Sequence, residues 1–389
     1  MGGAIQEIFR RHGPAYLAEF GKTLPGSHAR VIEAIIDCRS AACGSVLYQC
    51  EDCGEPHVAA RCCGNRHCPV CQQGKAEAWL ARQLDRQLPT PYFMLTFTVP
   101  APLREFLRGH PREGYGALFA ASAGAIKALA ADDQHLGADT PGFFGVLHTW
   151  GRPLQYHPHI HYVIPGGGFH RADGRWHAAN RGFFLPVRAL SPIFRAKFRD
   201  AMDAAGLLAE IDPAVWTVDW NVNCQSVGDA QASLEYLSRY VFKVAISEGR
   251  ILRADDTEVV FRYRKVNSQR ERTMALPPAE FIRRFLQHVL PTGFMKVRYF
   301  GFLSPSCSMS IKEVKARIEL ARGFAVSAAE AADNQSEHPT PRRPICPHCG
   351  GRLRCCGVLL PRPLGSRDLS RPREIGGKPV GASAGCGSG

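Results

Sequence analysis

The chain has 389 residues, of which 45% are hydrophobic and 21% are charged. This composition excludes an intrinsically disordered protein and provides apolar material for one large core or for two to three smaller domains. With 48 Lys and Arg residues against 35 Asp and Glu residues, the formal net charge is +13. That charge favours a polyanionic partner, and nucleic acid is the first candidate, although ribosomal and membrane-surface proteins are also basic.

Two features argue against export and membrane insertion. Residues 1–6 lack the basic region and apolar core of a signal peptide, and Gln6 does not fit the myristoylation pattern. The most apolar long stretch, 116–131, is alanine-rich and interrupted by Lys127, so it predicts a soluble helix that is too short to span a bilayer. We therefore expect a cytoplasmic protein without a membrane partner.

The beginning of the chain predicts two or three short helices. Apolar residues recur at helical spacing from Ile5 to Ile36, and the pattern is broken at Pro14 and again at Pro25-Gly26. Ser27 follows the second break and is typical of a helix N-cap.

Cysteines dominate the next segment. The chain has 15 cysteines, and eight of them fall between Cys38 and Cys71. In a chain that we expect to be cytoplasmic, such a cluster indicates metal rather than disulfides. Two Cys-x-x-Cys pairs predict one tetrahedral zinc site of ribbon type, with the ligands Cys50, Cys53, Cys68 and Cys71. The segment holds further soft ligands whose roles the sequence leaves open, namely Cys38, His57, Cys63 and His67.

Strands and helices then alternate. A helical pattern at 76–88 precedes a β-branched and aromatic run at 92–100, which predicts a buried strand. Residues 102–136 predict helices, and 143–150 predict another strand that ends in His148-Thr149-Trp150. Only Gly151 to Tyr156 separate that strand from the next, which is a hairpin-like connection. His148 could therefore lie beside the following strand, as a metal neighbour or as a structural residue.

Three histidines alternate along the following strand, at 156–165, which reads YHPHIHYVIP. Successive side chains of a strand point to opposite faces, so His157, His159 and His161 should project from one face. Neutral imidazole is the commonest metal ligand in proteins, and three adjacent imidazolium ions would repel one another. The pattern therefore predicts that these three side chains bind a divalent metal.

A tyrosine pair follows downstream. Residues 185–208 predict a helix, 215–222 predict a strand, and Gln225 in the next loop is a candidate additional metal ligand. In the helical segment 234–243, Tyr236 and Tyr240 lie one turn apart beside an apolar stripe. Either phenol could attack a phosphodiester held on the metal, with Arg239 and Lys243 close enough to balance the phosphate charge.

The last third of the chain carries less information. A half-buried strand is expected within 251–267 and a helix at 278–290. Residues 324–344 have the composition of a linker. Cys346 and Cys349 then form a third Cys-x-x-Cys pair, with Cys355 and Cys356 as candidate partners, but their spacing is irregular and the Gly/Pro-rich tail predicts partial disorder.

Together, the His-Pro-His-Ile-His strand, the Tyr-x-x-x-Tyr helix and the cysteine-rich start resemble the two-tyrosine HUH transposases of the insertion-sequence 91 family. The similarity extends to FMLTFTVP at 93–100, EFIRRFLQHVL at 280–290 and RYFGF at 298–302, and it covers about 37–303. The resemblance implies a metal-dependent endonuclease for single-stranded DNA that joins a tyrosine to the 5′ phosphate of the cut strand and later reseals it. It also implies Mg²⁺ or Mn²⁺ at the histidines, beside structural Zn²⁺.

We accordingly expect an α+β protein in three parts. Residues 1–85 would form an N-terminal zinc-ribbon-like module, 86–303 an HUH nuclease domain with a mostly antiparallel sheet flanked by helices, and 304–389 a linker and tail. The expected function is rolling-circle transposition on single-stranded DNA. The alternatives are a rolling-circle replication initiator or relaxase, and a non-catalytic zinc-dependent DNA-binding regulator in which the histidine strand is structural.

Overall fold

The structure is a computed structural model that describes residues 3–72, 75–241, 245–264, 270–323 and 344–361, without the side chains of residues 239 and 240. The helices in these ranges are α1 (Ala4–Phe20), α2 (Gly26–Asp37), α3 (Lys75–Asp85), α4 (Leu103–Gly109), α5 (Pro111–Ala131), α6 (Val187–Ala204), α7 (Gln231–Val241), α8 (Pro278–Leu286) and α9 (Ile311–Ala321). The strands are β1 (Ser45–Cys50), β2 (Pro56–Ala60), β3 (Tyr92–Thr98), β4 (Thr140–Pro141), β5 (Phe143–Trp150), β6 (Tyr156–Pro165), β7 (Gly167–Phe169), β8 (Trp176–Ala178), β9 (Asn221–Ser226), β10 (Ile251–Ala254), β11 (Val259–Arg264), β12 (Glu271–Leu276), β13 (Val297–Phe300) and β14 (Leu353–Leu359).

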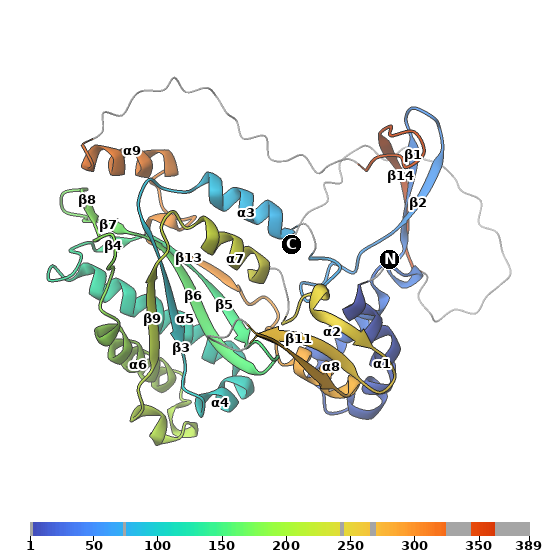
Figure 1. The fold of residues 1–389 in the computed structure, drawn as a ribbon, viewed down its shortest axis with the longest axis horizontal. Helices are drawn as coiled ribbons and strands as arrows, with labels where there is room; N and C mark the ends of the chain where they lie inside the picture. Colours follow the sequence, from blue (N-terminus) through green and yellow to red (C-terminus); the bar gives the residue numbers. More distant parts are fainter. Residues whose placement is uncertain (1–2, 73–74, 242–244, 265–269, 324–343, 362–389) are drawn as a thin grey trace.

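A five-stranded sheet with the order β13-β5-β6-β3-β9 forms the centre of the larger body (Figure 1). Every neighbouring pair in this sheet is antiparallel. The histidine strand β6 is the middle strand, with β5 on one side and β3 on the other. The expected α+β class and the mostly antiparallel sheet are confirmed.

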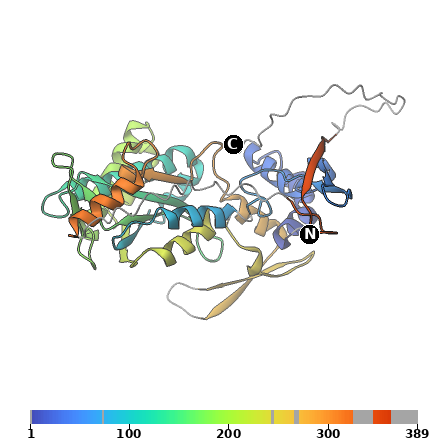
Figure 2. The ribbon, with the colours of Figure 1, turned by 90° about the horizontal axis from the view of Figure 1, so that it is seen from above.

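Helices cover both faces of this sheet (Figure 2). One face contributes Phe97, Leu147 and Ile160 to a core that also contains α5 and α6. The other face contributes Val146 and Val163 to a core with α3 and α7, and this is the face on which the odd-numbered residues of β6 lie. The tyrosine helix α7 therefore packs on the same face of the sheet that carries the histidines.

A second body surrounds the N-terminus. Helices α1 and α2 share a hydrophobic core with α8 and with β11, which belongs to the three-stranded sheet β10-β11-β12. Strand β14 pairs antiparallel with β1, so residues near the C-terminus join the N-terminal hairpin. The predicted divisions at 85/86 and 303/304 remain predictions, but the hydrophobic cores do not follow them.

Helix α5 lies within the range 102–136 that the sequence predicts as helical, and it begins before the apolar stretch 116–131. Among the described residues it is the one helix long and apolar enough to cross a membrane by length and composition, and 67% of its apolar window is buried inside the protein. Leu118, Ala125 and Ile126 are fully buried in the core behind the sheet. The apolar surface of α5 is thus used for packing in the fold.

The predicted strand at 215–222 is wrong. Residues Pro213–Trp216 form a 3-10 turn that begins with a proline and is capped by Asp212, whose carboxylate accepts a hydrogen bond from the Ala214 amide. The indole of Trp220 is buried and donates to the Val215 carbonyl at 3.1 Å. The alternation of apolar residues reflects burial of this turn, and the strand β9 starts only at Asn221.

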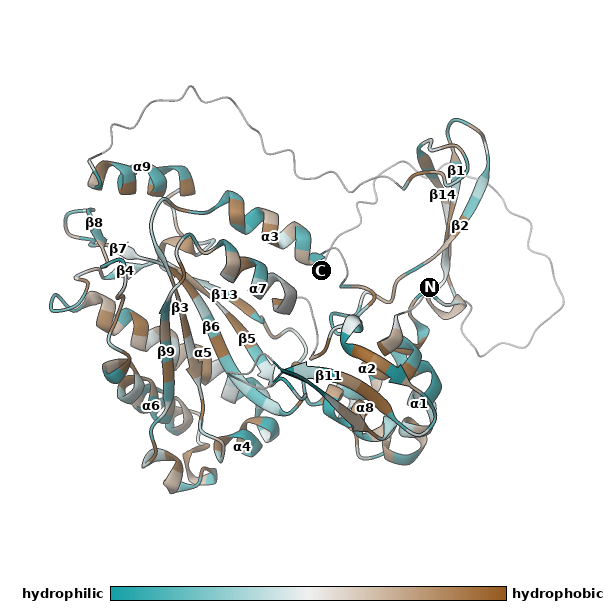
Figure 3. Cartoon of the chain, in the orientation of Figure 1, coloured by the Kyte–Doolittle hydropathy of each residue, from teal (hydrophilic) through white to brown (hydrophobic). Residues whose placement is uncertain are grey.

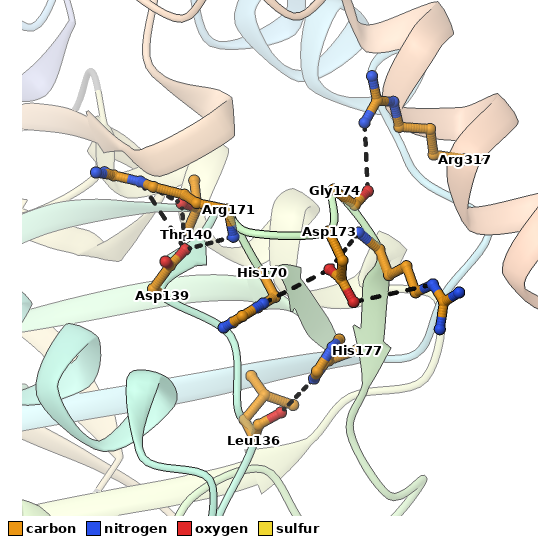
Figure 4. Close-up of polar contacts among 10 residues, drawn as sticks. Leu136, Asp139, Thr140, His170, Arg171, Asp173, Gly174, His177 and Arg317 are labelled. Carbon is orange, nitrogen blue, oxygen red and sulfur yellow. Dashed lines mark hydrogen bonds and ion pairs between the residues drawn. The ribbon is translucent and has the colours of Figure 1, made fainter.

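Polar contacts hold the small sheet β4-β7-β8 at one end of the larger body (Figure 4). His177 Nδ1 donates to the Leu136 carbonyl at 3.3 Å. Arg317 of α9 donates to the Gly174 carbonyl at 3.3 Å, which ties α9 to the β7–β8 hairpin. Both contacts are partly buried, and they lie on a different hairpin from the one that carries the histidines of β5 and β6.

Candidate functional site

Three histidines come together on the middle of the sheet. One ring nitrogen from each of His148, His159 and His161 lies within 4.8 Å of the other two. His148 stands directly opposite His159 in the register of β5 and β6, and the His159 and His161 rings are 4.8 Å apart. Strand β6 is hydrophilic toward the end that carries the histidines and hydrophobic toward its other end (Figure 3). No carboxylate in the described part of the chain joins this group.

His157 does not belong to this group, in contrast to the prediction. The group with one ring nitrogen from each member in mutual reach has His148 in the third place, where the sequence pattern predicts His157. The ring of His157 is nevertheless as close to that of His159 as the ring of His148 is, with centroid distances of 5.1 Å and 5.2 Å. The nitrogen positions therefore favour His148 as the third ligand, and a ligand role for the His157 side chain stays a prediction.

Hydrogen bonds fix the orientation of two of these rings. The Nδ1 atom of His159 donates to the carbonyl of His157 at 2.7 Å. Because a carbonyl can only accept, the proton is on Nδ1 and the lone pair of Nε2 is available to a metal. Thr96 of β3 hydrogen-bonds His161 Nδ1 through its hydroxyl at 2.9 Å, and with Thr96 as acceptor His161 has the same tautomer. His157 thus acts through its backbone.

Burial keeps the three imidazoles neutral at physiological pH. It holds the pKa of His148 and that of His159 well below the usual value, and neighbouring histidines lower both further. It lowers the pKa of His161 to about 4. A neutral imidazole is the form that binds metal, so the group needs no deprotonation before it can bind.

Tyr236 is the described tyrosine next to this group. Leu234 and Leu237 of α7 pack against the sheet, which fixes the helix over the histidine face. The ring centroid of Tyr236 is 6.1 Å from that of His161, with the rings nearly perpendicular. The Tyr236 side chain is 41% exposed, so its phenol is accessible to a substrate.

The remaining residues predicted on this helix lie partly outside the description. Tyr240 lies on α7 one helical turn after Tyr236, and Arg239 lies between them. The side chains of both residues, and the whole of Lys243, lie outside the described residues. Their assignment to the site stays a prediction.

Arg104 is a cation beside the histidines that the sequence does not reveal. It lies on α4, and its positive charge lowers the pKa of both His157 and His159. Its Nε atom is buried and has no hydrogen-bond partner among the described residues. Burial also lowers the pKa of Arg104, so this guanidinium would gain from a bound anion.

An open row of polar side chains continues from the histidines across the sheet. Thr96 lies opposite His161 on one side and Asn223 on the other, while Thr98 is flanked in the same way by His159 and Asn221. The two asparagines are exposed at the edge strand β9. Gln225 lies two strands from β6, a distance of about 9–10 Å, and level with Val163 rather than with a histidine.

The predicted cysteine ligands are divided between two groups. Cys68 and Cys71 join Cys38 and Cys63, with sulfur distances of 3.5 Å for the Cys38–Cys71 and Cys63–Cys71 pairs. Four thiolates at about 2.3 Å from a zinc ion would be about 3.8 Å apart, so the donor set fits tetrahedral zinc. The side chain of Gln6 and that of Arg10, both on α1, donate to the Cys38 carbonyl at 2.8 and 2.9 Å, which positions this ligand.

Cys50 and Cys53 belong to the other group, which Cys346 and Cys349 complete. His57 touches this group, because its Nε2 atom is 3.2 Å from the sulfur of Cys346. The prediction of a single site with Cys50, Cys53, Cys68 and Cys71 is therefore corrected. The ligands of this second group come from two segments that are far apart in the chain. The spacing of the cysteines within 50–71 therefore does not reveal the group. The Cys-x-x-Cys signature at Cys346 was the available signal.

His67, whose role was open, is a packing residue. It is buried, and its Nε2 atom accepts a hydrogen bond from the Leu290 amide at 3.1 Å. Burial lowers its pKa to about 3. With Nε2 engaged by the backbone, His67 links the cysteine loop to the segment after α8.

Comparisons with known proteins agree with this architecture. The family model described as "Putative transposase" matches residues 142–310, and the "Transposase zinc-binding domain" matches 8–99. "Putative transposase y4qJ" of Sinorhizobium fredii (strain NBRC 101917 / NGR234) is 39% identical over 325 residues, which are 78% of this chain and 80% of the relative. "Transposase for insertion sequence element IS801" of Pseudomonas savastanoi pv. phaseolicola is 28% identical over 331 residues, 79% of this chain and 78% of the relative.

No solved structure matches the chain significantly. The first model spans β5, β6 and α7, which carry the three histidines and Tyr236, and the second spans the cysteine segment up to β3. The chain therefore belongs to the transposases of the insertion-sequence 91 type, with their N-terminal transposase zinc-binding domain.

Proposed function

We propose that this transposase nicks and rejoins single-stranded DNA through a 5′-phosphotyrosine intermediate and so drives rolling-circle transposition. One observation carries the proposal: the exposed ring of Tyr236 is 6.1 Å from the ring of His161, on the face where three imidazoles converge. A nucleophile beside a metal-binding group is the minimal equipment for breaking a phosphodiester without a bound nucleotide cofactor.

The three imidazoles would hold one divalent cation. Imidazole suits Mn²⁺ and other transition metals, whereas Mg²⁺ prefers oxygen ligands, and no carboxylate in the described residues joins the group. Of the two expected metals we therefore favour Mn²⁺. When bound, the cation supplies positive charge next to the scissile phosphate and to the 3′ oxygen that leaves.

Tyr236 would act as the nucleophile. Its phenol oxygen forms a bond to phosphorus, the bond from phosphorus to the 3′ oxygen breaks, and a proton from the phenol balances the free 3′ hydroxyl. The ester retains the free energy of the broken bond, so a 3′ hydroxyl can reverse the reaction without ATP. Tyr240, one helical turn along α7, would allow a second strand to be held before the first is released.

Arg104 would bind the phosphate. The buried guanidinium nitrogen has no partner among the described side chains and main-chain groups, and its charge already acts on His157 and His159. A charge-assisted hydrogen bond to a phosphate oxygen would satisfy it. Arg239 and Lys243 are predicted to add positive charge from the tyrosine helix.

Single-stranded DNA is the partner that the sheet surface favours. The exposed Asn221 and Asn223 extend the histidine face toward the edge of the sheet and offer uncharged donors and acceptors. A duplex would keep its base edges paired, whereas a single strand can present them to such a surface. We infer that the protein acts in the bacterial cytoplasm, on DNA of the nucleoid.

The proposal is tested by cleavage of a labelled single-stranded oligonucleotide taken from an element end. Wild-type protein with Mn²⁺ should give a nicked product, and His159→Ala should abolish nicking while folding and bound zinc are unchanged. His157→Ala is the matched control and should retain most activity, because its backbone carbonyl remains. Nicking by His159→Ala at the wild-type rate would refute the metal centre.

The same assay separates the alternatives. A replication initiator or relaxase would share the nicking and rejoining chemistry but should act on its own origin sequence, whereas the transposase should cut the element end and join it to a target DNA. A non-catalytic zinc-dependent regulator would bind the oligonucleotide and leave it intact with every metal.

A further inference from the structure

The structure assigns a second zinc site, which is shared between the N-terminal hairpin and the C-terminal Cys-x-x-Cys pair and fastens residues 344–361 to the N-terminal body. Its ligands are Cys50, Cys53, Cys346 and Cys349. Two sulfur pairs cross between the segments, Cys50–Cys349 at 3.4 Å and Cys53–Cys346 at 3.9 Å. The model for the transposase zinc-binding domain matches 8–99 and contains only half of these ligands.

The two halves of the site have the same local structure. The amide of Cys50 donates to the Glu55 carbonyl at 2.9 Å, and the amide of Gly54 donates to the Cys50 carbonyl at 3.1 Å. The amide of Cys346 donates to the Gly351 carbonyl at 2.8 Å, and the amide of Gly350 donates to the Cys346 carbonyl at 2.9 Å.

Both segments read Cys-x-x-Cys-Gly, and both glycines have a positive φ, of 73° at Gly54 and 77° at Gly350. Two equivalent turns that face each other with four thiols are the architecture of a zinc ribbon. The zinc ribbon is not apparent from the sequence because its two halves are far apart in the chain.

Besides the pairing of β14 with β1, little apolar burial holds the two segments together, so we expect a zinc ion to be their main attachment. The hydrophobic cluster at the site consists of Cys50, Cys346 and Leu353, with Tyr48 packed against it. Burial of one or two such side chains stabilises far less than a structural zinc ion, whose binding free energy is coupled to folding. Pairing of β14 with β1 would follow from the zinc rather than replace it.

The two zinc sites stabilise different parts of the chain. The site of Cys38, Cys63, Cys68 and Cys71 adjoins the core of α1, α2 and α8, because Cys38 and Cys68 are part of that core. The second site stands outside the cores that flank the central sheet and links the chain after residue 343 to the β1–β2 hairpin. Loss of the second site should therefore release the C-terminal segment without unfolding the nuclease sheet.

The test uses the full chain with a specific protease site inserted between residues 324 and 343. After cleavage, the C-terminal fragment of the zinc-loaded protein should co-elute with the body in gel filtration. In the variant Cys346→Ser with Cys349→Ser, the fragment should elute separately, and the zinc content should fall by one ion per chain. A matched control is Cys355→Ser with Cys356→Ser, two exposed cysteines of β14, which should change neither result.

Three outcomes would overturn the inference. One is a fragment that stays bound in Cys346→Ser with Cys349→Ser, which would show that pairing of β14 with β1 suffices. Another is an unchanged zinc content in that variant. Separation of the fragment from zinc-loaded wild type would equally contradict the assignment.

Discussion

The histidine centre and the second cysteine group are built in opposite ways. The histidines lie on the middle strands of a sheet whose two faces are packed by separate hydrophobic cores. The second cysteine group belongs to a small cluster in which two of its own ligands, Cys50 and Cys346, are buried beside Leu353. Packing therefore preorganises the histidine centre before any metal binds, whereas the cysteine group depends on its metal. Removal of a ligand should reduce activity at the histidine centre and should disrupt the local structure at the second cysteine group.

The largest effect on structure is expected for the cysteine group that adjoins a core. Cys68→Ser should remove one zinc ion and unfold the body formed by α1 and α2, because about 10–16 kcal/mol of metal binding is coupled to folding there. Thermal unfolding and zinc content should both report it. Cys62→Ser, at an exposed neighbour outside the group, is the control. A Cys68→Ser protein with normal zinc content and normal stability would remove the distinction between the two kinds of site.

At the histidine centre, loss of the phosphate contact should reduce rate and leave stability unchanged. Arg104→Gln should lower the cleavage rate about 10²–10³-fold, the typical effect of removing one charge-stabilising donor. Arg104→Lys should recover part of the rate. Arg108→Gln, on the same helix and engaged with Glu105, is the matched control with a normal rate. Equal rates for the glutamine variants at both positions would exclude Arg104 from phosphate binding.

A smaller effect is expected from the hydroxyl that orients His161. Thr96→Val removes the hydrogen bond to His161 Nδ1 and should weaken Mn²⁺ binding about 10–100-fold with little change in the melting temperature. Calorimetric titration measures the affinity. Thr98→Val changes the same face of β3 opposite His159 and should bind Mn²⁺ normally. A common affinity for both variants would show that Thr96 does not position the ligand.

The smallest effect concerns buried histidines outside the metal group. Burial lowers the pKa of His288 to about 3, below the usual value in an unfolded chain. As the pH falls from about 6.5 to about 3, the unfolded chain therefore binds a proton that the folded chain does not, and stability decreases by about 1.4 kcal/mol per pH unit for this residue. His288→Gln should reduce the pH slope of the unfolding free energy by that amount between pH 6 and 5. An unchanged slope would contradict the depressed pKa.

Sequence patterns predicted the parts of the site that depend on local structure. Alternation along 156–165 identified the histidine strand, and helical spacing placed Tyr236 beside an apolar stripe, where α7 now packs on the histidine face. The short connection between β5 and β6 made His148 a candidate neighbour of the metal, but the sequence left a structural role equally open. The choice of His148 over His157 required the register between the two strands, which no pattern within one strand contains.

Two further errors have different origins, one in a contact between distant residues and the other in the chemistry of a local turn. The sequence predicts one site because four of its cysteines lie close together in the chain. In the structure, Cys50 is instead grouped with Cys349, which follows it by 299 residues. Apolar alternation at 215–222 resembled a strand, but a proline and the cap of Asp212 turn the chain there. The role of Arg104 could not be predicted from the sequence. A single arginine belongs to no motif there, and only the fold shows that it lies beside the histidines.

The central claim is that the tyrosines of α7 attack the phosphate, and packing and chemistry predict different results for one measurement. Each protein is incubated with labelled single-stranded DNA and Mn²⁺, and adducts that survive denaturation are counted. Tyr236→Phe with Tyr240→Phe keeps both rings, so the protein should fold and bind DNA but form no adduct, because no other group replaces the phenol oxygen. Adduct formation by the double variant at the wild-type level would contradict the account.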